Sequence, residues 1–176
     1  MKNLLLSILL IWTSTALFSQ ELQNPNKPFI TLSSEPGYVT INELSAGFGL
    51  GKTGPDYSTS FFGFTTIHGY QINKRFITSG GTGILFYNGG ALVPLFIDVR
   101  FRFDFKPVTP YLWEQTGVLM NFSDFQDSKA FVAFGAGGQY AFSKKLAANL
   151  GLGGMIQYGG VRDSFIVVKA GVTYVF

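Results

Sequence analysis

Apolar and polar residues alternate along most of this chain, which is the pattern of β-strands that have one apolar face. In the segment 91–105 every odd position is apolar, and the even positions carry the charges Asp98, Arg100, Arg102 and Asp104. The C-terminal segment repeats the pattern, with apolar or aromatic residues at the even positions from Ile166 to Phe176 and Lys169 on the opposite face. Such segments exceed the roughly five or six residues of an ordinary strand. They match the ~9 to 11 residues with which a tilted strand crosses a membrane.

Turn signals divide the chain into eight segments of this kind, at about 38–51, 60–71, 76–87, 91–105, 109–122, 129–142, 146–158 and 164–176. Eight is the smallest usual strand number of a bacterial transmembrane barrel. The pattern therefore predicts an all-β fold, an eight-stranded antiparallel up-and-down transmembrane β-barrel over residues 37–176. The segments 60–71 and 76–87 alternate poorly, so their inward and outward faces stay open.

The connections differ in character between the two ends of this barrel. Three short connections lie at one end, and their turns contain basic residues and no acid. We call these residues the basic rim: Lys74, Arg75, Lys106, Lys144 and Lys145. An even strand count places both termini at this end, on the periplasmic side. We expect the rim to attract anionic phospholipid headgroups; solvated turn residues are the alternative. At the other end Asn88-Gly89 predicts a two-residue hairpin whose central residues both accept a positive φ.

The N-terminal residues 1–20 have the three regions of a cleaved secretory signal peptide. Lys2 precedes an apolar run from Leu4 to Trp12, and small and polar residues follow. This run is too short to span a hydrocarbon core ~30 Å thick. The chain has no cysteine, which excludes an acylated lipoprotein anchor. Residues 21–36 contain three prolines and predict an extended periplasmic lead-in.

Composition agrees with a wall that faces lipid. Only 13% of residues are charged and 47% are hydrophobic, whereas a soluble domain has roughly 25% charged residues. The net charge of +3 gives no reason to expect nucleic acid binding. The chain has 22 glycines and 19 phenylalanines, and both are in surplus. The glycines indicate strands that bend and leave room for large side chains in a narrow barrel.

The inward charges predict a polar plug. An eight-stranded barrel is only wide enough for side chains to fill it, and buried charges must pair. We expect the following charged residues to form a cluster in the lumen: Glu43, Asp98, Arg100, Arg102, Asp104, Glu114 and Lys169. Glu114 and Gln115 are consecutive, so one of them faces the wrong way unless a bulge intervenes. A narrow ion path lined by these groups is the alternative function of the cluster.

Catalytic and ligand motifs are weak. Gly51-Lys52-Thr53 ends a relaxed phosphate-loop pattern, but Gly54-Pro55 follows and breaks the helix that such a loop needs. His68 is the only histidine, so we expect a barrel-wall residue, with no metal, no cofactor and no catalytic site. Asp124 and Asp127 are too few oxygen ligands for a good calcium site.

The run Val93–Phe101, the basic turns and the terminal Tyr174-Val175-Phe176 resemble the small outer-membrane β-barrel proteins of Bacteroidetes-type bacteria, often labelled the porin family. The resemblance implies a bacterial outer-membrane location with lipid neighbours. It also implies that Tyr174 and Phe176 carry the aromatic C-terminal signal read by the barrel assembly machinery.

These features predict a non-enzymatic outer-membrane protein with a structural or interaction role. A narrow porin-type channel for ions or small solutes is the second hypothesis, and a barrel enzyme that uses His68 is the third. A soluble lipocalin-like barrel, with apolar side chains inside and charges outside, is the architectural rival.

Overall fold

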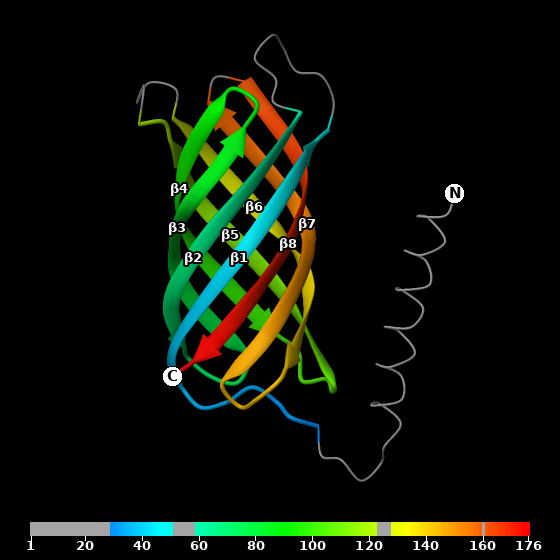
Figure 1. Cartoon of the computed structure of the whole chain (residues 1–176). Helices are drawn as coiled ribbons and strands as arrows, with labels where there is room; N and C mark the ends of the chain where they lie inside the picture. The colour runs from blue at the N-terminus through cyan, green and yellow to red at the C-terminus, as the bar shows by residue number, and fades with distance from the viewer. Residues whose placement is uncertain (1–28, 51–58, 123–127, 160) are drawn as a thin grey trace, which may run out of the picture.

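The computed structural model describes residues 29–50, 59–122, 128–159 and 161–176, which form one closed β-barrel (Figure 1). Its strands are β1 (Gly37–Gly49), β2 (Ser60–Gln71), β3 (Phe76–Tyr87), β4 (Gly90–Arg102), β5 (Val108–Met120), β6 (Lys129–Ala141), β7 (Leu146–Gly159) and β8 (Val161–Val175). Each strand pairs antiparallel with the next, and β8 closes the sheet on β1. The predicted strand number and topology are confirmed.

The two ends of the barrel keep the predicted difference. The turn end holds the short connections 72–75, 103–107 and 142–145, together with both ends of the described barrel wall. The loop end holds the connections after β1, β3, β5 and β7. No helix among the described residues is long and apolar enough to cross a membrane. The predicted signal peptide 1–20 and the first part of the lead-in, 21–28, lie outside the described residues.

Strict alternation sets which side chains face the lumen. Odd-numbered residues are buried in seven strands, and even-numbered residues are buried in β4. The switch arises at the β3–β4 hairpin, where Tyr87 pairs with Gly90 across a turn made by Asn88 and Gly89. Residues paired across a sheet share a face, so an odd position opposite an even one changes the inward parity. In the β4–β5 pair Arg102 is paired with Tyr111, again an even position with an odd one, so the inward positions of β5 are odd-numbered.

The Asn88-Gly89 hairpin forms where predicted, but its backbone differs from the expected one. Among the described residues no residue other than glycine has a positive φ. The positive value falls on Gly90, at +149°, one residue beyond the expected pair. Gly90 is therefore the position at which a side chain would strain the turn.

The poorly alternating strands β2 and β3 also bury their odd positions. Glycine occupies several of these inward sites, including Gly63 and Gly81. An added Cβ at Gly63 would meet Leu85 at 2.2 Å, and one at Gly81 would meet the ring of Phe96 at 2.4 Å. Alternation is weak in the sequence because a glycine, rather than an apolar or polar side chain, fits opposite a large neighbour.

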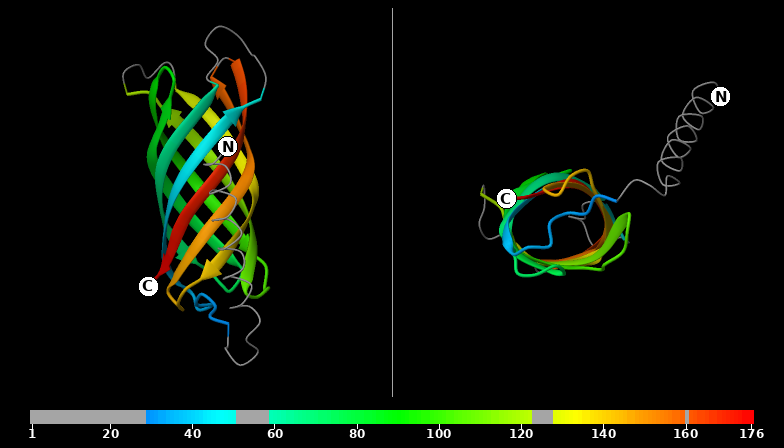
Figure 2. Two further views of the ribbon diagram at one scale, coloured as in Figure 1. Left: turned by 45° about the vertical axis from the view of Figure 1, so that its right-hand side comes forward. Right: turned by 90° about the horizontal axis from the view of Figure 1, so that it is seen from below.

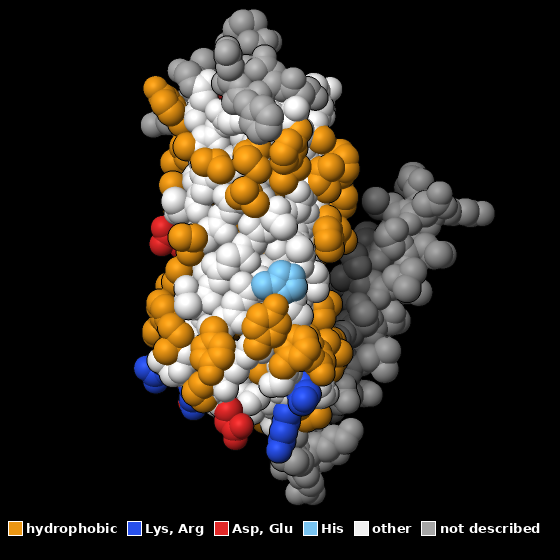
Figure 3. Space-filling view, turned by 90° about the vertical axis from the view of Figure 1, so that its left-hand side faces the viewer, with side chains coloured by type: hydrophobic (Ala, Val, Ile, Leu, Met, Phe, Trp, Pro, Cys, Tyr) orange, Lys and Arg blue, Asp and Glu red, His pale blue; other side chains and the backbone are white. Residues whose placement is uncertain are grey.

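The outer wall is apolar, and large exposed side chains occur on every strand. On the face shown in Figure 3 these side chains gather in an upper and a lower band around a belt with fewer of them. Polar residues also occupy paired outward positions near the middle of three adjacent strands, since Asn42 on β1 pairs with Thr66 on β2 and Thr66 pairs with Thr82 on β3. Charges inside and apolar side chains outside are the reverse of the lipocalin-like arrangement.

The described part of the lead-in, residues 29–36, contains no strand and crosses the turn-end mouth of the barrel (Figure 2, right). Leu32 is buried there. The Ser33 amide donates to Lys144 O at 2.7 Å. Gln71 Nε2 donates to Ser33 O at 3.0 Å and to Glu35 O at 2.9 Å. The lead-in is thus fixed to β2 and to the β6–β7 turn.

Candidate functional site

Four charged side chains meet at the centre of the lumen. Asp98 and Arg100 lie two residues apart on β4 and therefore share the inward face. Arg100 Nε donates to Asp98 Oδ1 at 2.9 Å and Arg100 Nη2 to Asp98 Oδ2 at 3.1 Å, a bidentate pair. Arg100 Nη1 lies 2.9 Å from Glu43 Oε1 on β1. Lys169 Nζ on β8 lies 3.8 Å from Glu43 Oε2. We call Glu43, Asp98, Arg100 and Lys169 the central cluster.

Neighbouring polar side chains extend this network. Gln115 on β5 donates from Nε2 to Asp98 Oδ2 at 2.8 Å, and its Oε1 accepts a hydrogen bond from Lys169 Nζ. Ser79 Oγ on β3 donates to Asp98 Oδ1 at 3.2 Å. Side chains from five strands therefore join in one network, which bridges the lumen in several directions.

Aromatic rings lie against the two cations. Lys169 Nζ is 3.9 Å from the centre of the Trp113 ring, and the Arg100 guanidinium is 5.7 Å from the centre of the Tyr111 ring. Both rings are buried on β5, on the turn-end side of Gln115. Cation–π contacts of this kind are strongest when desolvated.

The central cluster leaves little free space and no net charge. Two carboxylates face two cations, and all four residues are at most 6% exposed. A cavity beside Lys169 and Gln115 has a volume of about 20 Å³, which is room for about one water molecule. Toward the loop end, Phe61 packs edge-on against Phe165 with 5.4 Å between ring centres. Packed side chains therefore occupy the lumen both at the central cluster and toward the loop end.

Three residues predicted for the lumen cluster lie elsewhere, and two of them lie outside the lumen. Glu114 faces outward and is exposed, because β5 pairs without a bulge and Gln115 takes the inward position. Asp104 lies beyond the last residue of β4, where alternation no longer applies, and its side chain is 45% exposed. Both predictions are wrong. Arg102 faces inward but belongs to a separate group at the turn end.

Arg102 is buried next to the lead-in. Its Nη2 donates to Gln71 Oε1 at 2.6 Å and to Lys74 O at 3.0 Å. Its Nε is buried without a hydrogen-bond partner. The inward parity of Arg102 predicts a place in the lumen cluster, but the lead-in crosses the mouth of the barrel and forms a second polar layer around this residue.

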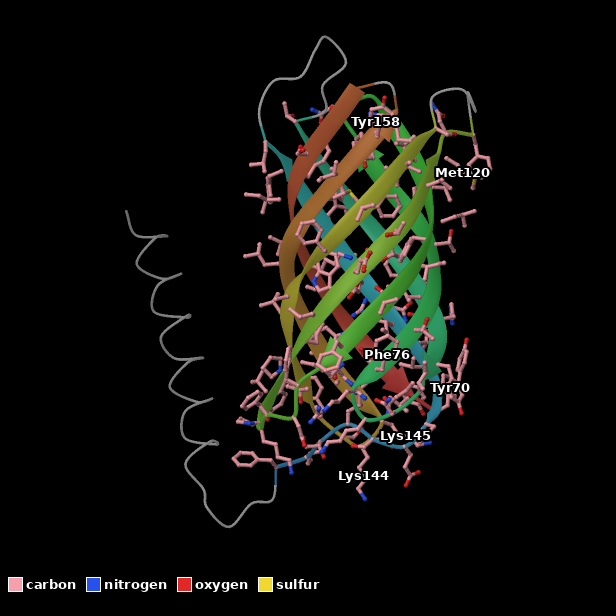
Figure 4. All side chains as sticks on the ribbon, turned by 180° about the vertical axis from the view of Figure 1, so that it is seen from behind. Tyr70, Phe76, Met120, Lys144, Lys145 and Tyr158 are labelled. Atoms are coloured by element: carbon pink, nitrogen blue, oxygen red, sulfur yellow. The ribbon has the colours of Figure 1, made fainter. Side chains whose placement is uncertain are left out.

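The basic rim lies at the turn end as expected, with Lys144 and Lys145 in the β6–β7 turn (Figure 4). The expectation that this rim holds no acid is wrong, because Asp104 lies in the β4–β5 connection and forms an ion pair with Lys74. That hydrogen bond from Lys74 holds the pKa of the Asp104 carboxyl below its ordinary value, and Lys106 and Arg75 lower it further.

Sequence reasoning did not assign several inward amides to a site. Gln139 Nε2 donates to Asn149 Oδ1 at 2.8 Å, and Asn149 Nδ2 donates to Thr173 Oγ1 at 2.7 Å. Their signal is present in the sequence, because each occupies the inward parity of its strand. Neutral amides carry no charge that must be paired inside the barrel, although they fill the same lumen.

His68 lies on the outer wall, where it is exposed. Its Nδ1 is 2.8 Å from Tyr38 Oη and its Nε2 is 3.0 Å from Thr66 Oγ1. Tyr38 also packs against the C-terminal Phe176, with 5.2 Å between ring centres. Among the described residues no group of three or more His, Cys, Asp or Glu side chains is placed to hold a metal. Lys52, Asp124 and Asp127 lie outside the described residues.

The predicted assembly-signal residues lie together at the end of β8. Phe176 is 64% exposed, and its ring meets the Tyr174 ring edge-on with 4.9 Å between centres. The Phe176 amide donates to Tyr38 O at 3.1 Å. The terminal aromatic pair is thus presented on the outer surface at the turn end.

Comparison with known proteins supports the fold. No protein-family model matches the chain, and no curated protein matches its sequence. Neisserial surface protein A is similar in structure, with a TM-score of 0.57, 17% identity, and coverage of 81% of this chain and 99% of that one. The outer membrane protein OprG from Pseudomonas aeruginosa is also similar, with a TM-score of 0.57, 10% identity, and coverage of 84% and 99%. The chain therefore has the fold of small outer-membrane β-barrels.

Proposed function

We propose that the chain is a bacterial outer-membrane protein with a sealed lumen and a structural or interaction role. Two structurally similar barrels are a surface protein and an outer membrane protein. The apolar outer wall and the charged interior suit a lipid environment. Cell fractionation and heat-dependent gel mobility test the location. Recovery of soluble protein without detergent would overturn it.

The central cluster carries the proposal of a sealed lumen. Its charges balance, and two contacts link strands on different sides of the barrel, from Arg100 to Glu43 and from Lys169 to Gln115. An ion that crossed the lumen would have to displace these side chains and break their pairing, which is costly away from bulk water. A narrow conducting path would instead require an open file of water past the cluster.

Planar-bilayer recording tests this proposal. We expect purified protein to show no reproducible single-channel conductance. Arg100→Ala shortens the side chain that joins Asp98 to Glu43, and Lys144→Ala is the matched control because it removes a cation that is outside the lumen. Discrete wild-type conductance that Arg100→Ala alters and Lys144→Ala does not would support the porin-type channel and refute the sealed lumen.

The terminal pair Tyr174 and Phe176 is proposed as the signal for the barrel assembly machinery. Its support is the outward placement of Phe176 at the end of the closing strand. Phe176→Ala should lower the amount of folded barrel in the outer membrane, measured by the heat-shifted gel band. The outward Val168→Ala on the same strand is the control and should leave that amount unchanged.

A further inference from the structure

A pocket of about 530 Å³ opens at the turn end, between the lead-in and the β2–β3 and β4–β5 connections. This volume lies within the roughly 300–1,000 Å³ typical of small-molecule sites. Thr31, Leu32 and Ser34 of the lead-in form one wall. That wall is fixed by the hydrogen bonds of Gln71 to the carbonyl oxygens of Ser33 and Glu35.

The charges around the pocket are unbalanced. Among the described residues that line it, the charged ones are Lys74, Arg75, Arg102, Lys106 and Asp104. Asp104 is the one acid among these lining residues, and Lys74 engages it. In the central cluster, by contrast, each carboxylate is matched by a cation. The excess of positive charge at the mouth therefore suits an anionic ligand.

Arg102 supplies a second, independent observation. The residue is only 5% exposed and lines the pocket, yet its Nε has no hydrogen-bond partner. The other contacts of the guanidinium, to Gln71 Oε1 and Lys74 O, hold the group in place. A buried cationic donor without a partner is costly, and an anion oxygen that reached Nε from the pocket would supply the missing acceptor.

We infer that this pocket binds a phosphate group, held by Arg102 together with Arg75 and Lys106. A phosphate group offers more oxygen acceptors and more charge than a carboxylate, which suits a site with several cations. Phe103 and Phe105 also line the pocket and provide apolar contact for the rest of a phosphate ester. The ligand class is thus a small phosphate ester or a phospholipid headgroup on the periplasmic side.

Binding is measured by isothermal titration of the full-length barrel in a non-ionic maltoside detergent, which carries no phosphate. Inorganic phosphate and glycerol 3-phosphate are the probes, and chloride at equal ionic strength is the reference. We expect saturable binding of glycerol 3-phosphate. An absence of saturation below about 10 mM for both probes in detergent, and in the lipid experiment below, would overturn the inference.

Variants with matched charge separate a site from general attraction to the basic rim. Lys106→Gln removes a cation that lines the pocket, and Lys145→Gln removes one from the β6–β7 turn outside its lining. We expect Lys106→Gln to weaken binding by roughly five- to tenfold and Lys145→Gln to leave it within about twofold. Equal losses in both variants would overturn the site.

The buried donor is tested in the same way. Arg102→Gln should weaken binding by at least about tenfold, because a charge-assisted hydrogen bond is lost. The heat-shifted gel band of this variant shows whether the barrel still folds. If Arg102→Gln does not fold, Lys106→Gln against Lys145→Gln still decides the question, since both of these side chains are exposed.

The source of the phosphate group is resolved with lipid nanodiscs. Protein in phosphatidylglycerol discs is compared with protein in uncharged glycolipid discs, with glycerol 3-phosphate as the titrant. Glycerol 3-phosphate that binds more weakly in phosphatidylglycerol discs than in glycolipid discs supports a lipid headgroup as the occupant. In Lys106→Gln this difference between the two kinds of disc should disappear. Equal binding in both discs supports a soluble phosphate ester. Absence of saturable binding in glycolipid discs as well as in detergent would refute the site.

Discussion

Arg100 on β4 donates to Glu43 on β1 at 2.9 Å, although β2 and β3 lie between these strands in the sheet. The contact therefore runs across the lumen rather than along the wall. Backbone hydrogen bonds connect each strand only with its two neighbours. Side-chain contacts of this type connect strands on opposite sides of the lumen.

Neutralising Glu43 should destabilise the barrel strongly. Glu43→Gln leaves the buried cations Arg100 and Lys169 with a single carboxylate, Asp98. Breaking a buried ion pair on one side costs about 3–5 kcal/mol. The free energy of unfolding in urea, followed by tryptophan fluorescence in lipid vesicles, measures the loss.

A second substitution distinguishes charge imbalance from lost packing. Lys169→Met together with Glu43→Gln returns the cluster to one acid and one cation, which remain paired as Asp98 and Arg100. The double variant should lose less stability than the sum of the two single variants, by at least about 1 kcal/mol. Strict additivity would show that the two charges act independently.

Glu114 and Gln115 are neighbours in sequence, but Glu114→Leu and Gln115→Leu should change the stability of the barrel in opposite directions. Glu114 points to the outer wall from the seventh of the 13 residues of β5, near the centre of the strand. Removing a charge from the lipid-facing wall should stabilise the barrel by about 1–2 kcal/mol. Gln115→Leu removes partners from Asp98 and Lys169 and should destabilise it by about 1–3 kcal/mol. Unfolding in lipid vesicles compares both, and stabilisation by Gln115→Leu would contradict the network.

The strands could be predicted from the sequence, but the inward face at Glu114 and Gln115 could not. The strands were predictable because an apolar wall around a polar interior forces strict alternation, and β4 shows that alternation most clearly. The faces of β5 were not decided by its charges, since Glu114 and Gln115 compete for one inward position. Register settles it, because Asp98 pairs with Gln115 and not with Glu114. Register depends on strand pairing over the whole barrel.

The turn end was the least predictable region. The period-two pattern predicts a strand as far as residue 105, with Asp104 in the lumen, whereas β4 ends at Arg102. The hydrogen bonds of the lead-in to Gln71 join residues that are 38 and 36 positions apart. Such contacts depend on the path of an irregular segment, which has no periodic signal. The pocket of about 530 Å³ arises from that path.

Adjacent glycines in β7 provide a test of packing around Trp113. A Cβ at Gly153 would lie 2.2 Å from Phe134 O and 2.6 Å from Trp113 Cζ2, whereas one at Gly154 would meet Phe165 O at 3.8 Å. Gly153→Ala should therefore destabilise the barrel by about 1–3 kcal/mol through overpacking. Gly154→Ala is the matched control and should change stability little. Urea unfolding measures the stability of both variants. Similar losses of stability in the two would indicate a general effect of alanine in β7 and would contradict the overpacking at Gly153.

The Lys74–Asp104 ion pair predicts a pH response at the rim. Because Lys74 lowers the pKa of Asp104, the carboxyl should titrate below the ordinary value of about 3.9, as observed by carbon-13 NMR of labelled aspartate. A carboxyl whose pKa is lower in the folded state stabilises that state above the unfolded-state pKa, and the contribution disappears as the pH falls through the folded-state value. Lys74→Gln should move the Asp104 midpoint upward. Lys145→Gln, in a different turn, should leave it unchanged, and an equal shift in both variants would assign the effect to the net charge of the rim instead of the pair.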